Sequence, residues 1–119
     1  MTKIERKFRV AGDIKLELVN VFEPGEVFIE GTVMLERAKR TGANLNQETI
    51  KIVLENKHLL PEELKGFDIV LLGTVRRIGS RKIKVISYLR NKGGNWVEGF
   101  GGVRYDWGER ARLLRACAQ

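Results

Sequence analysis

The sequence of 119 residues contains little of the chemistry that marks enzymes, metal proteins or secreted proteins. Cys117 is the single cysteine and His58 the single histidine, so the chain forms neither an internal disulfide nor a cluster of His and Cys metal ligands. No apolar run reaches the ~18 residues of a membrane span, and no charged-then-apolar segment resembles a secretory leader. We therefore expect a cytoplasmic protein with no metal site and no contact with a membrane.

The sequence also lacks a catalytic or cofactor-binding motif. The Gly-Phe-Gly-Gly stretch at 99–102 has neither the strand-loop-helix order nor the GK[ST] ending of a phosphate-binding loop. Ser80 and Ser87 lack the sharp turn that exposes a nucleophilic serine, and Glu62 and Glu63 would point apart in one helical turn. We predict a non-enzymatic protein without a cofactor. A pocket that uses one carboxylate as a base is the enzymatic alternative that stays open.

Acidic residues are missing from the stretch between Asp68 and Glu98. Residues 1–68 hold 11 basic and 12 acidic side chains, whereas 69–119 hold 11 and 3, so the second part carries the whole excess of +7. This bias favours nucleic acid or another polyanion as a partner. The alternative is that the charges keep an exposed hairpin from pairing with other chains. The candidate polyanion-binding residues are Arg76, Arg77, Arg81, Lys82, Lys84, Arg90 and Lys92.

Residues 67–90 predict two strands that reverse at Gly79-Ser80, a pair suited to a two-residue hairpin turn. Such a turn places Ile78 opposite Arg81 and Leu72 opposite Ser87. Residues 69–72 are then apolar on both faces, which predicts a central strand covered on both sides and a basic tip that projects. In this register one face carries Val70, Leu72, Thr74, Ile83, Val85 and Leu89, and the other carries Ile69, Leu71, Val75, Ile86 and Tyr88.

The first half of the chain predicts more strands. Residues 1–10 form either a frayed terminus or an edge strand, and the alternation in 13–22 indicates a strand. A turn at 23–26 leads to an antiparallel second strand over 26–36, in which Gly31 marks a bulge. Residues 37–46 are expected to be a loop with a small basic cluster, Arg37, Lys39 and Arg40.

The next segments contain the main ambiguity. Residues 47–56 suit a strand or one face of a helix, and their β-branched content favours the strand. Residues 61–66 predict one helical turn, because proline begins the segment and glycine ends it.

The last third predicts a turn at 91–95 and a strand over 96–107. Asp106 and Glu109 have the spacing of a helix-capping pair, which predicts a C-terminal helix with Trp96 and Trp107 beneath it. The expected fold is a single α+β domain over 1–119. It has a curved antiparallel sheet of about six strands, either open or rolled into a partly open barrel, with the C-terminal helix packed on it.

Aromatic residues gather in the basic half of the chain. Tyr88, Trp96, Phe100 and Trp107 are candidates for stacking against single-stranded nucleic acid or for lining a pocket, and Tyr105 belongs to the same cluster. Aromatic side chains on alternating strand positions also build cores. The competing interpretation is an apolar cavity for a small organic ligand, or an apolar face that forms a homodimer.

Short motifs give one resemblance. The order Leu60-Pro61, then Gly73-Thr74 with Arg76 two residues after the threonine, then Trp96, then Asp106-Trp107 resembles that of motifs in small uncharacterised bacterial proteins carried on integron gene cassettes. The resemblance spans about residues 50 to 115. It implies a bacterial cytoplasmic protein with an accessory role and assigns no functional residue.

Overall fold

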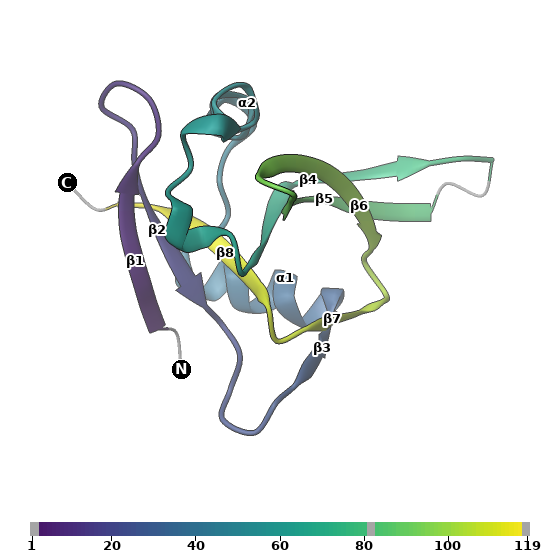
Figure 1. Ribbon diagram of the computed structural model, residues 1–119. Coiled ribbons are helices and arrows are strands. Elements are labelled where there is room, and N and C mark those ends of the chain that lie inside the picture. Colours follow the sequence, from purple (N-terminus) through teal and green to yellow (C-terminus); the bar gives the residue numbers. More distant parts are fainter. Residues whose placement is uncertain (1–2, 81–82, 118–119) are drawn as a thin grey trace.

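The computed structural model describes residues 3–80 and 83–117, with residues 73–76, 78 and 83 described by their backbone alone. It has an α+β fold in which a six-stranded sheet stays open and does not close into a barrel (Figure 1). Neighbouring strands of this sheet are antiparallel except β4 and β8, which are parallel. The strands in spatial order are β1 (Lys3–Arg9), β2 (Lys15–Asn20), β8 (Ala111–Ala116), β4 (Asp68–Ile78), β5 (Ile83–Lys92) and β6 (Asn95–Gly102).

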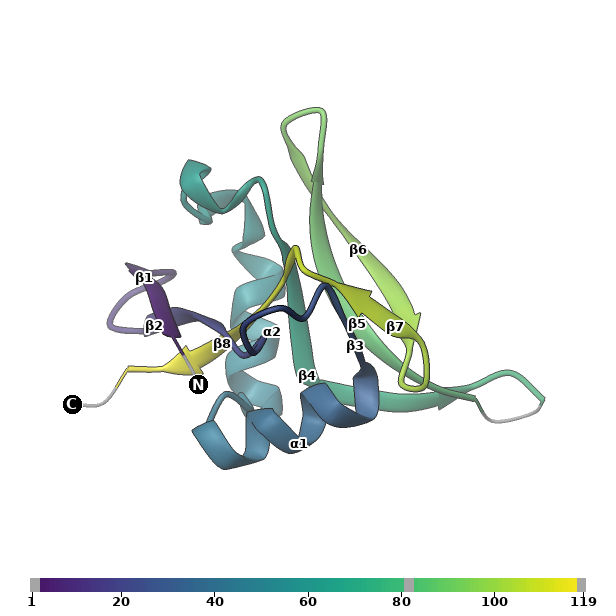
Figure 2. The ribbon, with the colours of Figure 1, turned by 90° about the horizontal axis from the view of Figure 1, so that it is seen from below.

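Two helices cover the two faces of this sheet. Helix α1 (Gly31–Thr41) packs on one face and α2 (Gln47–Glu55) on the other, and Figures 1 and 2 show the sheet between them. Each face therefore has its own apolar core. The α2 side includes Leu16, Leu18, Ile50, Val53, Ile69, Leu71, Leu89, Trp96 and Leu114. The α1 side includes Val19, Met34, Ala38, Val70, Leu72, Ile86, Val103, Trp107 and Leu113.

The predicted second strand over 26–36 is wrong beyond its first residues. Only β3 (Phe28–Glu30) is extended, and it pairs with β7 (Asp106–Gly108) in a separate two-stranded sheet. Gly31 begins α1 and marks no bulge. The predicted loop over 37–46 is also shorter than expected, because α1 continues to Thr41. Gly42 caps the end of the helix with a φ of 75°. Met34 and Ala38, four residues apart, turn one helical face to the core.

The preference for a strand over 47–56 is also wrong. Asn46 caps α2 by accepting a hydrogen bond from the Thr49 N–H at 2.8 Å. Ile50 and Val53 are buried, whereas a strand would have buried Ile50, Ile52 and Leu54. The capping residue, rather than β propensity, decided the local structure.

The predicted C-terminal helix is a strand. β8 lies near the centre of the sheet between β2 and β4, with Leu113 buried on the α1 side and Leu114 on the α2 side. A strand covered on both faces has no alternation to distinguish it from a helix. Trp96 and Trp107 consequently do not lie together under a helix, because they belong to the cores on opposite sides of the sheet.

The hairpin exists, but its predicted register is wrong. Ile78 pairs with Ile83, so four residues rather than two connect the strands. Nearer the base Leu71 pairs with Ser87, and Val70 with Tyr88. The grouping of Ile69 with Leu71, and of Val70 with Leu72, is correct, whereas β5 is inverted: Leu89 joins the side of Ile69, and Ile86 and Tyr88 join the side of Val70. The predicted faces of Thr74, Val75 and Ile83 lie outside the described side chains. The central position of β4 is confirmed.

Several local predictions are confirmed. β2 occupies most of the predicted first strand, and of the two alternatives for residues 1–10 the edge strand is the one observed, as β1 over residues 3–9. The Glu26 N–H donates to the Glu23 carbonyl oxygen across the predicted turn. Short 3-10 turns η1 (Lys57–Leu59) and η2 (Glu62–Leu64) precede β4, the second at the expected place.

Within the described residues, neither helix combines the length and the apolar composition that crossing a bilayer requires.

Candidate polyanion-binding arm

The outer part of the β4–β5 hairpin is a two-stranded ribbon. Strand β8 pairs with β4 only as far as Val70, and β6 pairs with β5 only from Val85 onward. Residues 76–80 and 83–84, here called the arm, therefore have no third strand beside them among the described residues. Figures 1 and 2 show β4 and β5 extending there beyond the rest of the molecule, as the sequence predicts.

An irregularity in β4 separates the arm from the central sheet. Between Leu71 and Arg76 the strand advances five residues while its partner advances two, from Ser87 to Val85. Extra residues in one strand bend it and increase its twist. This bulge changes the direction of the arm, and together with the four-residue connection it explains why register counted from a two-residue turn fails. Gly73, a strand glycine within it, was the available signal.

Arg77 and Lys84 lie directly opposite each other on the arm, and both are exposed. Among the described residues no carboxylate forms an ion pair with either side chain. Like charges directly across an antiparallel ladder repel each other and destabilise the pair. The arm thus presents two adjacent positive charges that no described carboxylate compensates.

Arg90, in contrast, is occupied in the body of the protein. Its Nε and Nη2 donate to the two carboxylate oxygens of Asp68, each at 2.9 Å, and its guanidinium lies 5.2 Å from the centre of the Tyr88 ring. The hydrogen bonds to Asp68 raise the pKa of Arg90 above its usual value. This side chain joins β5 to β4 at the base of the hairpin and belongs to the framework.

The other predicted basic residues are distributed unevenly. Lys92 is exposed at the opposite end of β5, about 26 Å from Lys84 at ~3.3 Å per residue. Arg76 is placed by its backbone opposite Val85, while Arg81 and Lys82 lie outside the described residues. The structure therefore brings together only part of the predicted basic set. The separate cluster at Arg37, Lys39 and Arg40 lies toward the C-terminal end of α1, where Thr41 accepts from Arg115 of β8.

The predicted aromatic residues mostly build the cores. Tyr88 and Trp107 meet edge to face with centroids 5.6 Å apart on the α1 side, and Trp96 is buried on the α2 side. The glycines of β6 make room for these rings. A Cβ on Gly99 would lie 2.7 Å from the Tyr88 ring, and one on Gly101 would lie 2.5 Å from Trp107. Close packing of rings on backbone accounts for the glycine-rich stretch.

Two aromatic side chains are exposed beside the arm. Phe100 of β6 is 46% exposed, and Tyr105, in the turn that follows β6, is 71% exposed. The Tyr105 ring lies over Gly102, where a Cβ would be 3.1 Å from it, and Gly102 pairs with Val85 at the root of the arm. The sequence placed Tyr105 in the aromatic cluster but did not select it as a site residue, and its exposure follows from the end of β6 at Gly102.

Comparison with protein-family models, with curated proteins and with solved structures found no match. The site is therefore defined by its geometry alone.

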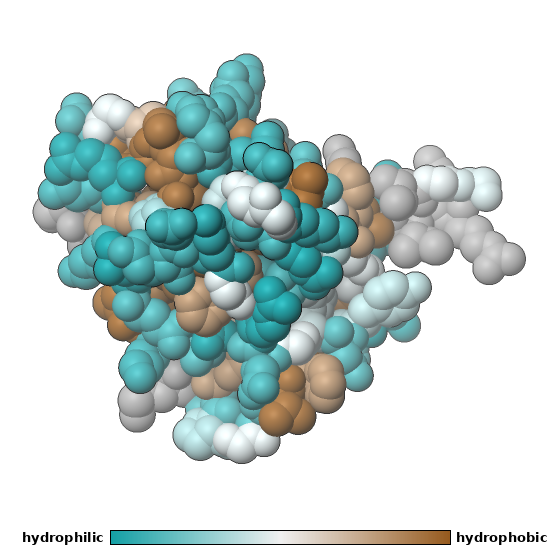
Figure 3. Space-filling view, viewed as in Figure 1, coloured by the Kyte–Doolittle hydropathy of each residue, from teal (hydrophilic) through white to brown (hydrophobic). Residues whose placement is uncertain are grey.

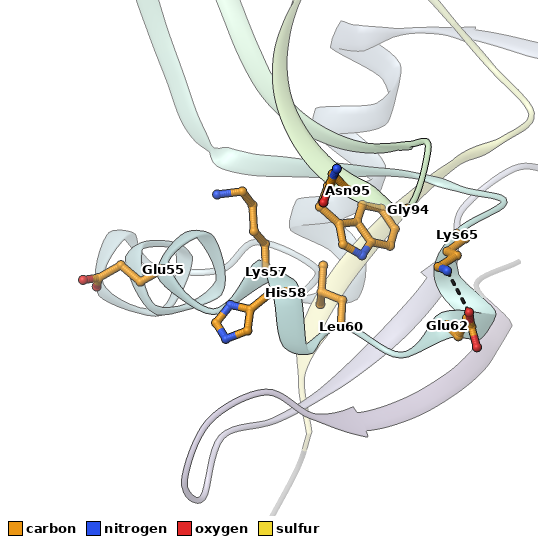
Figure 4. A pocket seen from close by; sticks show the side chains of 9 residues that line it. Glu55, Lys57, His58, Leu60, Glu62, Lys65, Gly94 and Asn95 are labelled. Atoms are coloured by element: carbon orange, nitrogen blue, oxygen red, sulfur yellow. Dashed lines mark hydrogen bonds and ion pairs between the residues drawn. The ribbon is translucent and has the colours of Figure 1, made fainter.

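A groove lies at the far end of β5 from the arm. It has a volume of about 410 Å³ and is bounded by η1, η2 and the β5–β6 turn. Figure 4 shows His58 and Lys57 on one side, with Leu60 beside them and the Lys65–Glu62 ion pair opposite. Trp96 also lines the groove. His58 is exposed, and no group of three or more metal-ligating side chains occurs among the described residues. The groove offers mixed charges and a small apolar wall.

Proposed function

We propose that this chain is a non-enzymatic binding protein whose arm contacts nucleic acid or another polyanion. The observation that carries the proposal is the exposed, directly opposed pair of Arg77 and Lys84 on a projecting ribbon. Their repulsion costs stability in the free protein, and a row of phosphates would remove that cost.

The arginines in the body of the protein differ from the basic residues of the arm. Most of the arginines outside the arm pair with carboxylates of the same chain, so their charge is used within the fold. These pairs include Arg6–Glu63, Arg37–Glu26, Arg90–Asp68, Arg112–Glu5 and Arg115–Glu17. The arm has no such partner in the part of the chain that the structure describes, and the sequence supplies no acidic residue between Asp68 and Glu98.

Protection against edge-to-edge pairing is the competing explanation of the charges. It predicts exposed cations on the free edges of the ribbon but no affinity for phosphates beyond that of any basic protein. The two explanations therefore differ in whether the position of the charge matters.

The test is binding of fluorescently labelled DNA and RNA, single-stranded and duplex, followed by anisotropy at several salt concentrations. We expect affinity to fall steeply with salt, by about 0.7 to 0.9 logarithmic units per decade for each phosphate contacted. Changing Arg77, Lys82 and Lys84 together to glutamate should abolish binding. The matched control changes three other basic residues, Lys39, Arg40 and Lys51, to glutamate. These residues are exposed, lie outside the arm and pair with no described carboxylate. An equal loss of affinity in the two triple variants, or an affinity that does not change with salt concentration, would refute the proposal.

A small-molecule site is the second candidate, and the groove beside Trp96 is the observation that favours it. The apolar residues on both faces of β4 do not call for a cavity, since α1 and α2 cover them. The face seen in Figure 3 is mostly hydrophilic, with apolar side chains in small scattered areas. A ligand of the groove should raise the melting temperature independently of salt and of Arg77 and Lys84.

A further inference from the structure

The geometry around Tyr105 points to the kind of polyanion that the arm binds. We infer that it is single-stranded nucleic acid, whose bases stack on Tyr105 and Phe100 while its phosphates contact the arm. The inference rests on the proposed function, because it needs the arm to bind phosphates.

The backbone of Tyr105 is fixed by hydrogen bonds, whereas its side chain is exposed. Its N–H donates to the Gly102 carbonyl oxygen at 3.2 Å, and its own carbonyl oxygen accepts from the Gly31 N–H at 3.0 Å. One side of the ring rests on Gly102, yet 71% of the residue is exposed. A ring fixed from behind with an open outer surface loses little conformational entropy when a base stacks on it.

Phe100 extends this surface along β6. It lies two residues before Gly102, so its side chain points to the same side of the strand as the position covered by the Tyr105 ring, about 7 Å away along the strand. Both aromatic residues remain substantially exposed, in contrast to Trp96 and Trp107. Base stacking on such rings tolerates any sequence, because every base has a flat face.

The aromatic surface meets the arm at one point. The Val103 N–H donates to the Lys84 carbonyl oxygen at 3.1 Å, which places the turn carrying Tyr105 beside Lys84. Arg104, exposed in the same turn, adds a third positive charge there.

The register decides between a single strand and a duplex. Phe100 pairs with Ser87, three residues from Lys84 on β5, so the aromatic residues and the Arg77–Lys84 pair lie on opposite faces of the ribbon. A ligand that touches both must pass around the edge of β5 beyond Lys84, the last β5 residue that the chain after β6 contacts through Val103. Duplex DNA stays straight over about 150 base pairs and touches one face, whereas a single strand bends around an edge.

The experiment compares a thymidine strand of about 12 nucleotides with an abasic strand of the same length and with its duplex. The abasic strand keeps the phosphates and lacks the bases. We expect the thymidine strand to bind roughly 5- to 100-fold more tightly than the abasic strand. Tyr105→Leu should remove most of this difference, and Tyr105→Phe, which keeps the ring, should preserve it. The slope of affinity against salt should not change in either variant, because no phosphate contact is lost.

Phe28→Leu is the matched control, since Phe28 is an aromatic residue 63% exposed on β3 and outside this surface. Melting temperatures of all variants establish that they fold. Equal affinity for thymidine and abasic strands, tighter binding of the duplex, or equal losses in Phe28→Leu and Tyr105→Leu would overturn the inference while leaving polyanion binding intact. Absence of salt-dependent binding to every strand would refute the proposed function itself.

Discussion

Gly31 and Val103 meet through their backbones. A Cβ atom on Gly31 would lie 2.2 Å from the Val103 carbonyl oxygen, closer than any real contact of this kind. The Gly31 N–H meanwhile donates to the carbonyl oxygen of Tyr105. The first residue of α1 is thus fitted against the turn that joins β6 to β7, and this contact fixes the turn beside the arm.

We therefore predict that Gly31→Ala destabilises the protein by about 2–3 kcal/mol, because a backbone oxygen cannot move aside as a side chain would. Urea unfolding followed by circular dichroism measures this loss. Gly66→Ala is the control, since nothing lies within 4 Å of a Cβ at that position. It should change the free energy of unfolding by less than ~0.5 kcal/mol. Equal stability of both variants would contradict the close approach of α1 to the turn.

The cap of α2 gives a second prediction. Asn46→Ala removes the acceptor of the Thr49 N–H, which should cost about 1 kcal/mol in the free energy of unfolding. Asn46→Asp keeps an acceptor and should retain most of the stability. Asn44 is exposed and does not cap the helix, so Asn44→Ala should have little effect on the free energy of unfolding. If the three variants unfold at the same urea concentration, residues 47–55 are not held as a capped helix.

The ion pair between Glu26 and Arg37 should make stability depend on pH. The hydrogen bonds from Arg37 and, to a smaller extent, the one from the Glu23 N–H together lower the pKa of Glu26 from 4.5 to about 2. A carboxyl whose pKa is lower in the folded state binds its proton more readily when unfolded. Its contribution is therefore complete above about pH 4.5 and is lost as the pH falls toward 2.

This contribution is isolated by comparing the wild type with Glu26→Gln. The wild type should be the more stable at pH 7, and the difference in urea midpoint should shrink steadily between pH 4.5 and pH 2. Glu48→Gln, an exposed residue of α2, controls for the loss of one negative charge. A difference that stays constant with pH would show that Arg37 does not hold Glu26 in this way.

The sequence predicted the elements whose pattern is local and strong. Strand β2 alternates, the 23–26 turn has proline and glycine in the required positions, and β4 is apolar on both faces. The prediction from sequence failed where a strand and a helix would bury the same residues. Leu113 and Leu114 suit a buried strand or a helix equally, and the decision depends on β2 and β4, which lie far away in the sequence. No local signal carries that information.

The candidate site was predictable in its charge but not in its geometry. The acid-free stretch identified Arg77 and Lys84, and it also included Arg90, whose partner Asp68 lies 22 residues earlier. Tyr105 was missed because its exposure depends on the place where β6 ends. Composition thus indicates which half of the chain carries the excess positive charge, whereas strand pairing decides which of its side chains remain exposed.

The opposed pair on the arm leads to the last prediction. Because Arg77 and Lys84 repel each other, Lys84→Gln should raise the free energy of unfolding slightly at low salt, by about 0.2–0.5 kcal/mol. The same change should weaken binding of single strands and reduce the slope of affinity against salt by about 0.7. Lys92→Gln removes an equal charge at the other end of β5 and should alter neither quantity. A gain in stability coupled to a loss of binding is expected only where a charge is kept for a ligand. If Lys84→Gln left binding unchanged, the arm charges would instead serve to prevent pairing with other chains.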